Sequence, residues 1–373
     1  MRILYLCKRQ YMGHDVIVDR YARLYEQPYQ LAQLGHDVLG LCLSYRNCQV
    51  KNETHETRQG SLRWIGLSAG KAFVNIFLYP YQTLRLTRAF KPDIIVGASD
   101  CMHVILGQWL AKKINAKYAA DLYDDYETFG LAKIPFIKML YRKALYKAQV
   151  ISSVSQSLSA YIKDNYSNKA DVITLPSTIN QSIFYPRDKN VSRNKFNLPP
   201  SIPIIGTAGG LTKEKGIETV YKAFTLLTQK IPNAHFILAG STDPKCTPPK
   251  HDRIHYLGKL SHTEVADFFC ALDVGVVYLN NSKYCELSFP QKAYEIAACK
   301  IPMVVTKVGD MSFLFSENKN ELYNANDAEG LCDSIYNQIL TPSIPNIHIE
   351  TWDMQAKKME YAYLTALQCP ISD

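Results

Sequence analysis

The sequence has no long hydrophobic run, no closely paired cysteines and no leader of the secretory type. No apolar segment reaches the ~18 residues that a membrane-spanning helix needs. The ten cysteines form no C-x-x-C pair, and Cys42, Cys270 and Cys299 lie inside apolar periodic segments. This usage is typical of reduced core thiols and argues against a disulfide framework or a zinc site. The chain enters an apolar strand at once, without a basic leader and cleavage site, so we expect a cytoplasmic protein.

The 373 residues are too many for one ordinary core and suit two domains. Positive charge is concentrated in the first half. Residues 1–186 carry 23 Lys and Arg against 14 Asp and Glu, whereas residues 187–373 carry 19 against 20. This asymmetry indicates an anionic partner for the first domain, which could be a membrane surface, a phosphorylated acceptor or nucleic acid.

Apolar strands alternate with amphipathic helices along most of the chain. We expect one such domain over 1–186, a polar, proline-bearing linker over 187–203, and a second domain over 204–350. A last helix over 351–373 is expected to pack back towards the N-terminal domain. The alternation predicts the α/β class, with two Rossmann-like, doubly wound parallel sheets. Ligands of such sheets bind outside the carboxyl ends of the strands.

The segment 277–309 carries the densest chemistry, in a predicted order of strand, long loop, helix, turn and strand. Ser288 and Gln291 have the spacing of a capping box, which predicts a helix that starts near Phe289. Ser288, Lys292, Glu295 and Cys299 then share one stripe of that helix. Its N-terminus suits a phosphate, and Glu295 lies roughly 10 Å further along the axis, near the ribose of the same nucleotide. The alternative is an ordinary amphipathic helix with a solvated Lys/Glu pair.

Glycines follow the first predicted strand of each domain. In the loop GGLTKEKG, Gly209 and Gly210 let the backbone approach an anion closely, and Lys215 offers a point charge for a diphosphate. A plain turn followed by solvated lysines is the alternative. Gly13 lies in the corresponding loop of the first domain, where parallel sheets place ligand loops.

An acidic cluster, DLYDDYETF, follows a predicted strand that ends near 121. Asp124 or Asp125 could orient a sugar or an acceptor hydroxyl. The cluster could instead bind a divalent metal or cap a helix.

These segments together resemble the GT-B glycosyltransferases, in particular the large retaining group called family 4, or glycosyl transferases group 1. GTAGGLTKEKGIETVYKAF is similar to the glycine-rich strand, loop and helix of that family. CELSFPQKAYEIAACKIPMVVTKVG is similar to its nucleotide-sugar segment, in the variant S-x-P-x-K-x-x-E. The resemblance implies two domains that face a central cleft, a UDP- or GDP-sugar donor, and no required metal.

The resemblance also assigns roles to residues. Leu260 would lie beside the base, and Glu295 would accept hydrogen bonds from the ribose hydroxyls. Ser288, Phe289 and Lys292 would hold the sugar diphosphate. The chain departs from the family pattern at Gly210, where the family has Arg, at Leu287, where it has Glu, and near Tyr123, where it often has His.

The mechanism that the resemblance implies proceeds with retention of configuration. Lys215 and Lys292 would stabilise the departing nucleotide diphosphate. The acceptor hydroxyl would attack from the same face, and the departing phosphate oxygen would take its proton. No protein nucleophile is needed for this route.

Residues 131–147 interleave basic and bulky apolar side chains, a pattern suited to an anionic bilayer. We therefore expect a peripheral protein on the inner face of the cytoplasmic membrane, with a lipid-linked or lipopolysaccharide acceptor, acting in cell-surface polysaccharide synthesis. A packed surface helix is the alternative, and nucleic acid is disfavoured because no reading motif accompanies the charge. Two other functions stay open: a nucleotide-sugar epimerase or phosphorylase, and a catalytically silent GT-B subunit that scaffolds a partner.

Overall fold

The computed structural model describes residues 1–70, 74–128, 130–166, 169–317 and 319–369. The chain forms two compact units. Unit 1 consists of Met1–Ser177 and Trp352–Asp373, and unit 2 is Thr178–Thr351. Each unit has its own sheet of mainly parallel strands, which confirms the predicted α/β class.

The sheet of unit 1 has the strand order β10-β9-β8-β7-β1-β4-β6-β5, in which β5 at the edge runs antiparallel to β6. The bounds are β1 Arg2–Lys8, β4 Asp37–Ser44, β5 Lys51–His55, β6 Ser61–Ser68, β7 Ile94–Ala98, β8 Lys117–Leu122, β9 Val150–Ser153 and β10 Asp171–Thr174. From β1 the chain first builds the sheet towards β4 and β6, and it then returns to the other side of β1 with β7. The strand order therefore reverses between β1 and β7, where open α/β sheets form a crevice for ligands.

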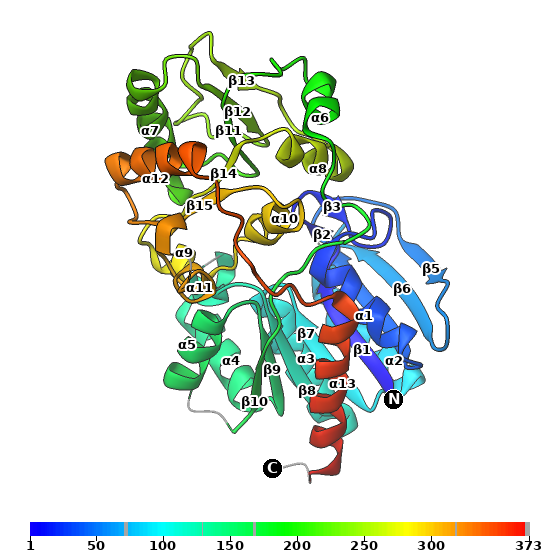
Figure 1. The fold of residues 1–373 in the computed structure, drawn as a ribbon. Coiled ribbons are helices and arrows are strands. Elements are labelled where there is room, and N and C mark those ends of the chain that lie inside the picture. Colours follow the sequence, from blue (N-terminus) through cyan, green and yellow to red (C-terminus); the bar gives the residue numbers. More distant parts are fainter. Residues whose placement is uncertain (71–73, 129, 167–168, 318, 370–373) are drawn as a thin grey trace. The chain divides into compact units, whose positions relative to one another are not determined.

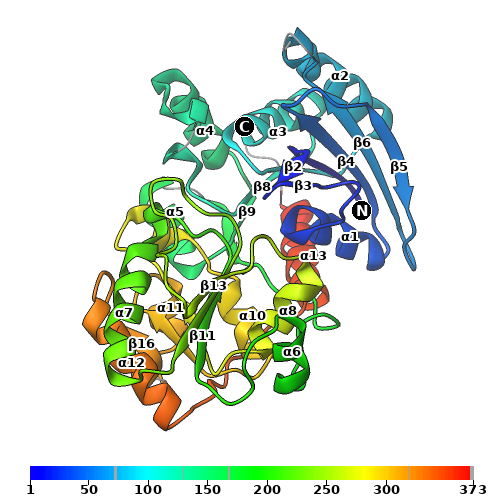
Figure 2. The ribbon, with the colours of Figure 1, turned by 90° about the horizontal axis from the view of Figure 1, so that it is seen from above.

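Helices cover both faces of this sheet, because right-handed crossovers on the two sides of β1 place them on opposite faces. Their bounds are α1 Ala22–Gln33, α2 Val74–Phe90, α3 Cys101–Ile114, α4 Pro135–Tyr146, α5 Gln156–Tyr166 and α13 Trp352–Gln368. Figure 2 shows α2, α3 and α4 on one side of the strands and α1 with α13 on the other. The C-terminal helix α13 thus belongs to unit 1, where Met359, Ala362 and Tyr363 enter the apolar core.

A buried ion pair ties α1 to the centre of the sheet in unit 1. Arg23 and Asp121 are both fully buried, and Arg23 Nε donates to the Asp121 carboxylate at 3.0 Å. Ser152 Oγ on β9 donates to the same carboxylate at 2.6 Å, and Arg23 also donates to the Leu175 carbonyl. The charges of this pair are therefore compensated by each other and by further hydrogen bonds, as buried charges require.

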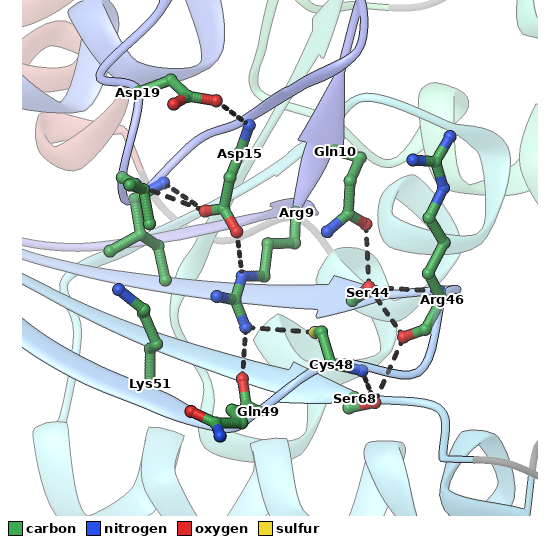
Figure 3. A network of polar contacts seen from close by, with 12 residues as sticks. Arg9, Gln10, Asp15, Asp19, Ser44, Arg46, Cys48, Gln49, Lys51 and Ser68 are labelled. Atoms are coloured by element: carbon green, nitrogen blue, oxygen red, sulfur yellow. Dashed lines mark hydrogen bonds and ion pairs between the residues drawn. The ribbon is translucent and has the colours of Figure 1, made fainter.

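A short hairpin follows β1 and is held by Arg9 (Figure 3). It consists of β2, Gln10–Tyr11, and β3, His14–Asp15, with Gly13 in its turn. The buried Arg9 side chain donates to the Asp15 carboxylate at 2.8 Å and to the Gln49 carbonyl at 2.6 Å. Gly13 has φ +91°, a backbone conformation that favours glycine. Its conformational role is thus the hairpin turn.

Unit 2 has the strand order β13-β12-β11-β14-β15-β16, with parallel pairing. The bounds are β11 Ile204–Ala208, β12 His235–Ala239, β13 Ile254–Tyr256, β14 Val274–Val277, β15 Met303–Thr306, β16 Leu322–Tyr323, α6 Lys189–Lys195, α7 Ile217–Lys230, α8 His262–Cys270, α9 Lys283–Leu287, α10 Lys292–Ala298, α11 Asp310–Leu314 and α12 Ala328–Leu340. Helices α7 and α12 pack together on one face, and α8 with α10 covers the other (Figure 1). The order reverses between β11 and β14.

The predicted linker 187–203 is not a linker in the structure. It lies inside unit 2 and contains α6, which packs on α8. Arg193 of α6 is buried, and it donates to the Ala271 carbonyl and to Asp273, at 3.0 and 2.6 Å. The polar composition of the segment is that of a surface helix with specific partners, and composition alone cannot distinguish these two cases. The chain leaves unit 1 after Ser177 and re-enters it at Trp352, so the predicted boundaries at 186 and 204 are displaced.

Candidate functional site

The glycine loop and α10 meet at the point where the strand order of unit 2 reverses. Gly209 and Gly210 follow β11 directly, and Tyr278 follows β14. The carboxyl ends of two neighbouring parallel strands therefore bring their loops to one edge of the sheet, which is where such sheets bind ligands.

The backbone of this loop is fixed by a close approach between glycines. Gly209 N donates to the Ala239 carbonyl at 2.9 Å, and a Cβ atom on Gly240 would lie only 1.9 Å from the Gly209 carbonyl oxygen. Gly209 and Gly240 also have φ of +119° and +121°. Both positions consequently require glycine, and the loop is held by the neighbouring strand before any ligand arrives.

Two lysine amines lie beside the loop. Lys292 Nζ on α10 is 3.8 Å from the position that a Cβ on Gly209 would take, and Lys215 Nζ is 3.9 Å from the equivalent position on Gly210. Lys292 Nζ also lies 4.4 Å from the ring centre of Tyr278 and 3.5 Å from Thr207 Oγ1. Within the described ranges neither amine forms an ion pair with a carboxylate. The loop thus has two amines beside it that are not paired with a carboxylate in the described ranges.

Burial shifts the pKa values of Lys292 and Glu295 on α10 in the directions that favour their neutral forms. Burial and, to a smaller extent, the charge of Lys215 lower the pKa of Lys292 to about 7, and the charge of Glu295 opposes part of this shift. Burial likewise raises the pKa of Glu295 to about 7, against the opposing charge of Lys292. An anion placed beside the two amines would restore the proton of Lys292. The arrangement is therefore suited to a diphosphate, with a carboxylate one helical turn further along.

Tyr278, Thr207 and Asn280 belong to this site, although the sequence did not single them out. Tyr278 Oη donates to the Gly210 carbonyl at 2.8 Å, while its ring faces Lys292. Asn280 Nδ2 donates to the Glu214 carbonyl at 2.6 Å and so fixes the turn that ends in Lys215. Their place in the sequence could have indicated them, because all three lie at or just after the carboxyl end of β11 or β14, where parallel sheets bind ligands.

The predicted capping box at Ser288 is wrong. The short helix α9 occupies the predicted loop, and Ser288 is its last flanking residue, with Oγ donating to the Cys285 carbonyl at 3.0 Å. Pro290 disfavours a helical conformation at Phe289, so α10 begins only at Lys292. Ser288 and Phe289 therefore precede α10, and the Phe289 ring packs on Tyr294 at 4.8 Å. Cys299 follows the end of α10 and is buried, so it is not on the polar stripe with Lys292 and Glu295.

Two other predicted positions of unit 2 contribute to packing. Leu260 is half-buried against the apolar core, just before the capping box that Ser261 and Glu264 form at the start of α8. Leu287, which stands where the family pattern has Glu, is buried, while Glu286 beside it is exposed. A role of Leu260 beside the base stays a prediction.

In unit 1 the four acidic residues in and after the end of β8 have four different environments. Asp121 is the buried partner of Arg23. Asp124 lines a cavity of about 490 Å³ at the carboxyl ends of β1, β7 and β8. Asp125 is buried and accepts a hydrogen bond from Glu127 N at 3.2 Å, in the manner of a cap, whereas Glu127 pairs with Lys138 and Arg142 at 3.0 and 2.6 Å. Of the two predicted catalytic acids, Asp124 faces a cavity and Asp125 stabilises the short turn Tyr126–Thr128.

Two properties of the described residues bear on other chemistry. They contain no group of three or more His, Cys, Asp or Glu side chains that could hold a metal ion. Across the described ranges, every helix is too short or too polar to cross a membrane.

Comparison with known proteins shows which family the second unit resembles. The family model described as glycosyl transferases group 1 matches residues 202–339, which contain the whole lysine and glycine site. These residues are thus similar to a group 1 glycosyltransferase domain. Solved structures extend the likeness to the whole chain: sucrose-phosphate synthase from Thermosynechococcus elongatus has a TM-score of 0.72 at 19% identity, over 98% of this chain and 96% of that one. HepE from Anabaena, in complex with UDP, has a TM-score of 0.67 at 13% identity, over 99% and 98%. The chain thus has the GT-B fold.

Two curated relatives share about a quarter of their aligned residues with this chain. The putative teichuronic acid biosynthesis glycosyltransferase TuaC of Bacillus subtilis is 26% identical over 62% of this chain and 60% of that protein. N-acetyl-alpha-D-glucosaminyl L-malate synthase of Bacillus anthracis is 23% identical over 69% and 70%. The match to TuaC spans less than two thirds of that protein's length.

Proposed function

We propose that the chain is a retaining glycosyltransferase that moves a sugar from a nucleotide-diphosphate sugar to a glycan or glycolipid acceptor. The observation that carries this proposal is the pair of amines, Lys215 and Lys292, beside the glycine loop. They have no carboxylate partner in the described ranges, and Glu295 lies one turn beyond Lys292. A diphosphate matches the two amines, and a ribose diol matches a carboxylate that accepts two hydrogen bonds.

The contribution of Lys215 and Lys292 to the proposed reaction is mainly electrostatic. Negative charge develops on the diphosphate as the bond to the sugar breaks, and amines already held in place stabilise it without reorganisation. The acceptor hydroxyl then attacks from the face that the diphosphate leaves, and the departing phosphate oxygen takes its proton. The anomeric configuration is retained, and Asp124 is the residue of unit 1 that we assign to orienting the acceptor hydroxyl.

A surface of unit 1 and one of the relatives support the proposed class of acceptor. Around α4 the side chains of Leu131, Ile134, Phe136 and Met139 are 48–61% exposed, and Lys133 and Lys143 are exposed beside them. Lys138 and Arg142 instead pair with Glu127, so part of the predicted basic face is occupied within unit 1. The remaining surface suits an anionic bilayer. Together with the relative in teichuronic acid biosynthesis, it supports a lipid-linked or lipopolysaccharide acceptor at the inner membrane face.

Titration calorimetry with UDP and GDP tests the donor site. We expect one of them to bind the parent protein, and Lys215→Met and Lys292→Met to weaken that binding at least about tenfold, since each removes a charge-assisted contact. Lys213→Met is the matched control, because the Lys213 side chain is 60% exposed and pairs with Glu218 at 3.4 Å. Absence of binding by the parent would favour the silent scaffold.

The reaction class needs a separate measurement. The anomeric proton of the product, followed by NMR with a membrane-derived acceptor, should show the configuration of the donor sugar. An inverted product would remove the retaining mechanism, and turnover of the nucleotide sugar without an acceptor would favour an epimerase.

A further inference from the structure

The cavity of unit 1 lies at the point where the strand order of that sheet reverses. Lys8 ends β1, Ser99 and Asp100 follow β7, and Tyr123 and Asp124 follow β8, and all five line the cavity of about 490 Å³. This is the same position in the sheet topology as the lysine and glycine site of unit 2. The cavity is therefore a second candidate site, with side chains of its own.

The backbone at the cavity wall is strained in one place. Ser99 has φ +78°, in the left-handed region that non-glycine residues rarely adopt. Two hydrogen bonds hold it there: Lys8 N donates to Ser99 Oγ at 2.7 Å, and Tyr123 Oη donates to the Ser99 carbonyl at 2.9 Å. Such strain persists where the surroundings enforce it, and it concentrates at ligand sites.

Lys8 lines this cavity, and among the described residues no carboxylate forms an ion pair with it. Its Nζ lies 5.4 Å from the ring centre of Tyr123 and 6.0 Å from that of Tyr11, and these two rings are 4.9 Å apart. No ion pair joins Lys8 to a carboxylate in the part of the chain that the structure describes. Burial lowers the pKa of Lys8, and the charges of Asp100 and Asp124 compensate only part of that effect. The ammonium group is thus desolvated with aromatic faces as its close neighbours.

Asp100 lines the same cavity but is already engaged. Its carboxylate accepts hydrogen bonds from the backbone N–H of His103 at 3.0 Å and from Tyr45 Oη at 3.0 Å, and His103 Nδ1 lies 2.8 Å away. Burial alone would raise the pKa of Asp100, but His103 and these hydrogen bonds outweigh it and hold the pKa below its ordinary value. Asp100 therefore serves as the N-cap of α3 and compensates the charge of Lys8 only in part.

We propose that this cavity binds the acceptor and that Lys8 selects an acceptor with a carboxylate or a phosphate group. The proposal rests on the function proposed above and adds the chemical class of the acceptor. The acidic group sits on Lys8, the body of the molecule packs on Tyr123, and a hydroxyl donates to Asp124. An uncharged polyol would leave Lys8 without a counter-ion, so it binds more weakly.

Three probes of one shape test this selection: D-glucose, D-glucuronate and D-glucose 6-phosphate, titrated into the full chain by NMR. We expect the two acids to bind at least about tenfold more tightly than glucose, and Lys8→Met to remove that difference. The glucuronate and phosphate arms show which oxyanion Lys8 prefers. Equal binding of glucose and the acids, no binding of any probe, or an unchanged preference in Lys8→Met would each overturn the proposal.

Variants of unit 2 separate this proposal from that of the donor site. Lys292→Met should leave the acidic probes bound as in the parent, and Lys8→Met should bind UDP or GDP as the parent does. If the acidic probes are lost in Lys292→Met instead, they occupy the amines of unit 2 and the acceptor proposal is wrong. If neither UDP nor GDP binds but binding of the acidic probes still requires Lys8, the donor-site proposal is wrong and the acceptor proposal for the cavity of unit 1 is supported.

Discussion

Lys292 and Glu295 are three positions apart on α10, and burial brings the pKa of each to about 7. The two side chains oppose each other's shift, but neither is returned to its ordinary value. The site consequently changes its charge within the physiological range of pH, and this has consequences for ligand binding that can be measured.

Above about pH 7, where Glu295 is mostly charged, nucleotide binding should weaken as the pH rises. Below its pKa of about 7, Lys292 carries the proton that a diphosphate needs, and above it binding must first take up a proton. The affinity should therefore fall by up to about tenfold per pH unit above 7. Calorimetry in buffers of different ionisation enthalpy would detect the proton uptake. Lys292→Arg stays charged and should show a much flatter profile; an equally steep one would exclude Lys292 as the titrating group.

Glu295→Gln should weaken nucleotide binding roughly tenfold or more, because a charged acceptor of two ribose hydrogen bonds becomes a neutral amide. Glu286→Gln is the control, since Glu286 is exposed and flanks the buried Leu287. Binding of a 2′,3′-dideoxy nucleoside diphosphate should be equally weak in the parent and in Glu295→Gln. A similar loss in both glutamine variants would count against the assigned role.

Gly240→Ala should destabilise unit 2 by at least about 2 kcal/mol, since its Cβ would lie 1.9 Å from the Gly209 carbonyl and its φ is +121°. Gly210→Ala is the matched control for stability, because the nearest atom to its Cβ is Thr212 Cγ2, 3.8 Å away. Chemical denaturation measures both. Equal midpoints for the two alanine variants would show that the glycine contact is dispensable.

Asp121→Asn should lower the free energy of unfolding of unit 1 by about 3–5 kcal/mol, because it leaves the Arg23 charge buried without its partner. Asp333→Asn breaks an exposed pair with Lys230 and should shift the denaturation midpoint little. The prediction fails if the two variants denature alike.

Phe136→Ser combined with Met139→Ser should reduce co-sedimentation with anionic vesicles, because both side chains are exposed beside Lys133 and Lys143. Phe313→Ser, on unit 2, removes a side chain of similar exposure, 62% against 61% for Phe136, and should leave sedimentation unchanged. If the parent protein does not co-sediment with anionic vesicles, α4 is an ordinary surface helix and the prediction is wrong.

The elements and the loops at their carboxyl ends were largely accessible from the sequence. Strand and helix periodicity depends on local pattern, and so do the glycine loop at Gly209 and the capping box of Ser261 and Glu264. For the same reason Lys215, Lys292 and Glu295 could be named in advance, and the structure brings them to one edge of the sheet.

What the sequence could not supply were partners that depend on packing. Asp121, Asp124, Asp125 and Glu127 look alike as an acidic cluster, yet each has different neighbours. Tyr278 carries no motif, and its role appears only when β14 lies beside β11. The break between α9 and α10 at Ser288 has two local causes. Pro290 restricts the backbone of Phe289, and α9 forms a separate short helix. The spacing of polar and apolar residues reveals neither of them.

The return of α13 to unit 1 sets an order for folding during synthesis. Unit 2 is one continuous stretch, Thr178–Thr351, so all of it is synthesised before α13. The face of α1 that α13 covers, and the places of Met359 and Tyr363 in the core, stay open until then. Unit 1, whose first segment is synthesised before unit 2, can therefore complete its core only after unit 2 has been synthesised. A chain arrested before Trp352 would contain all of unit 2 but would leave an apolar face of unit 1 uncovered.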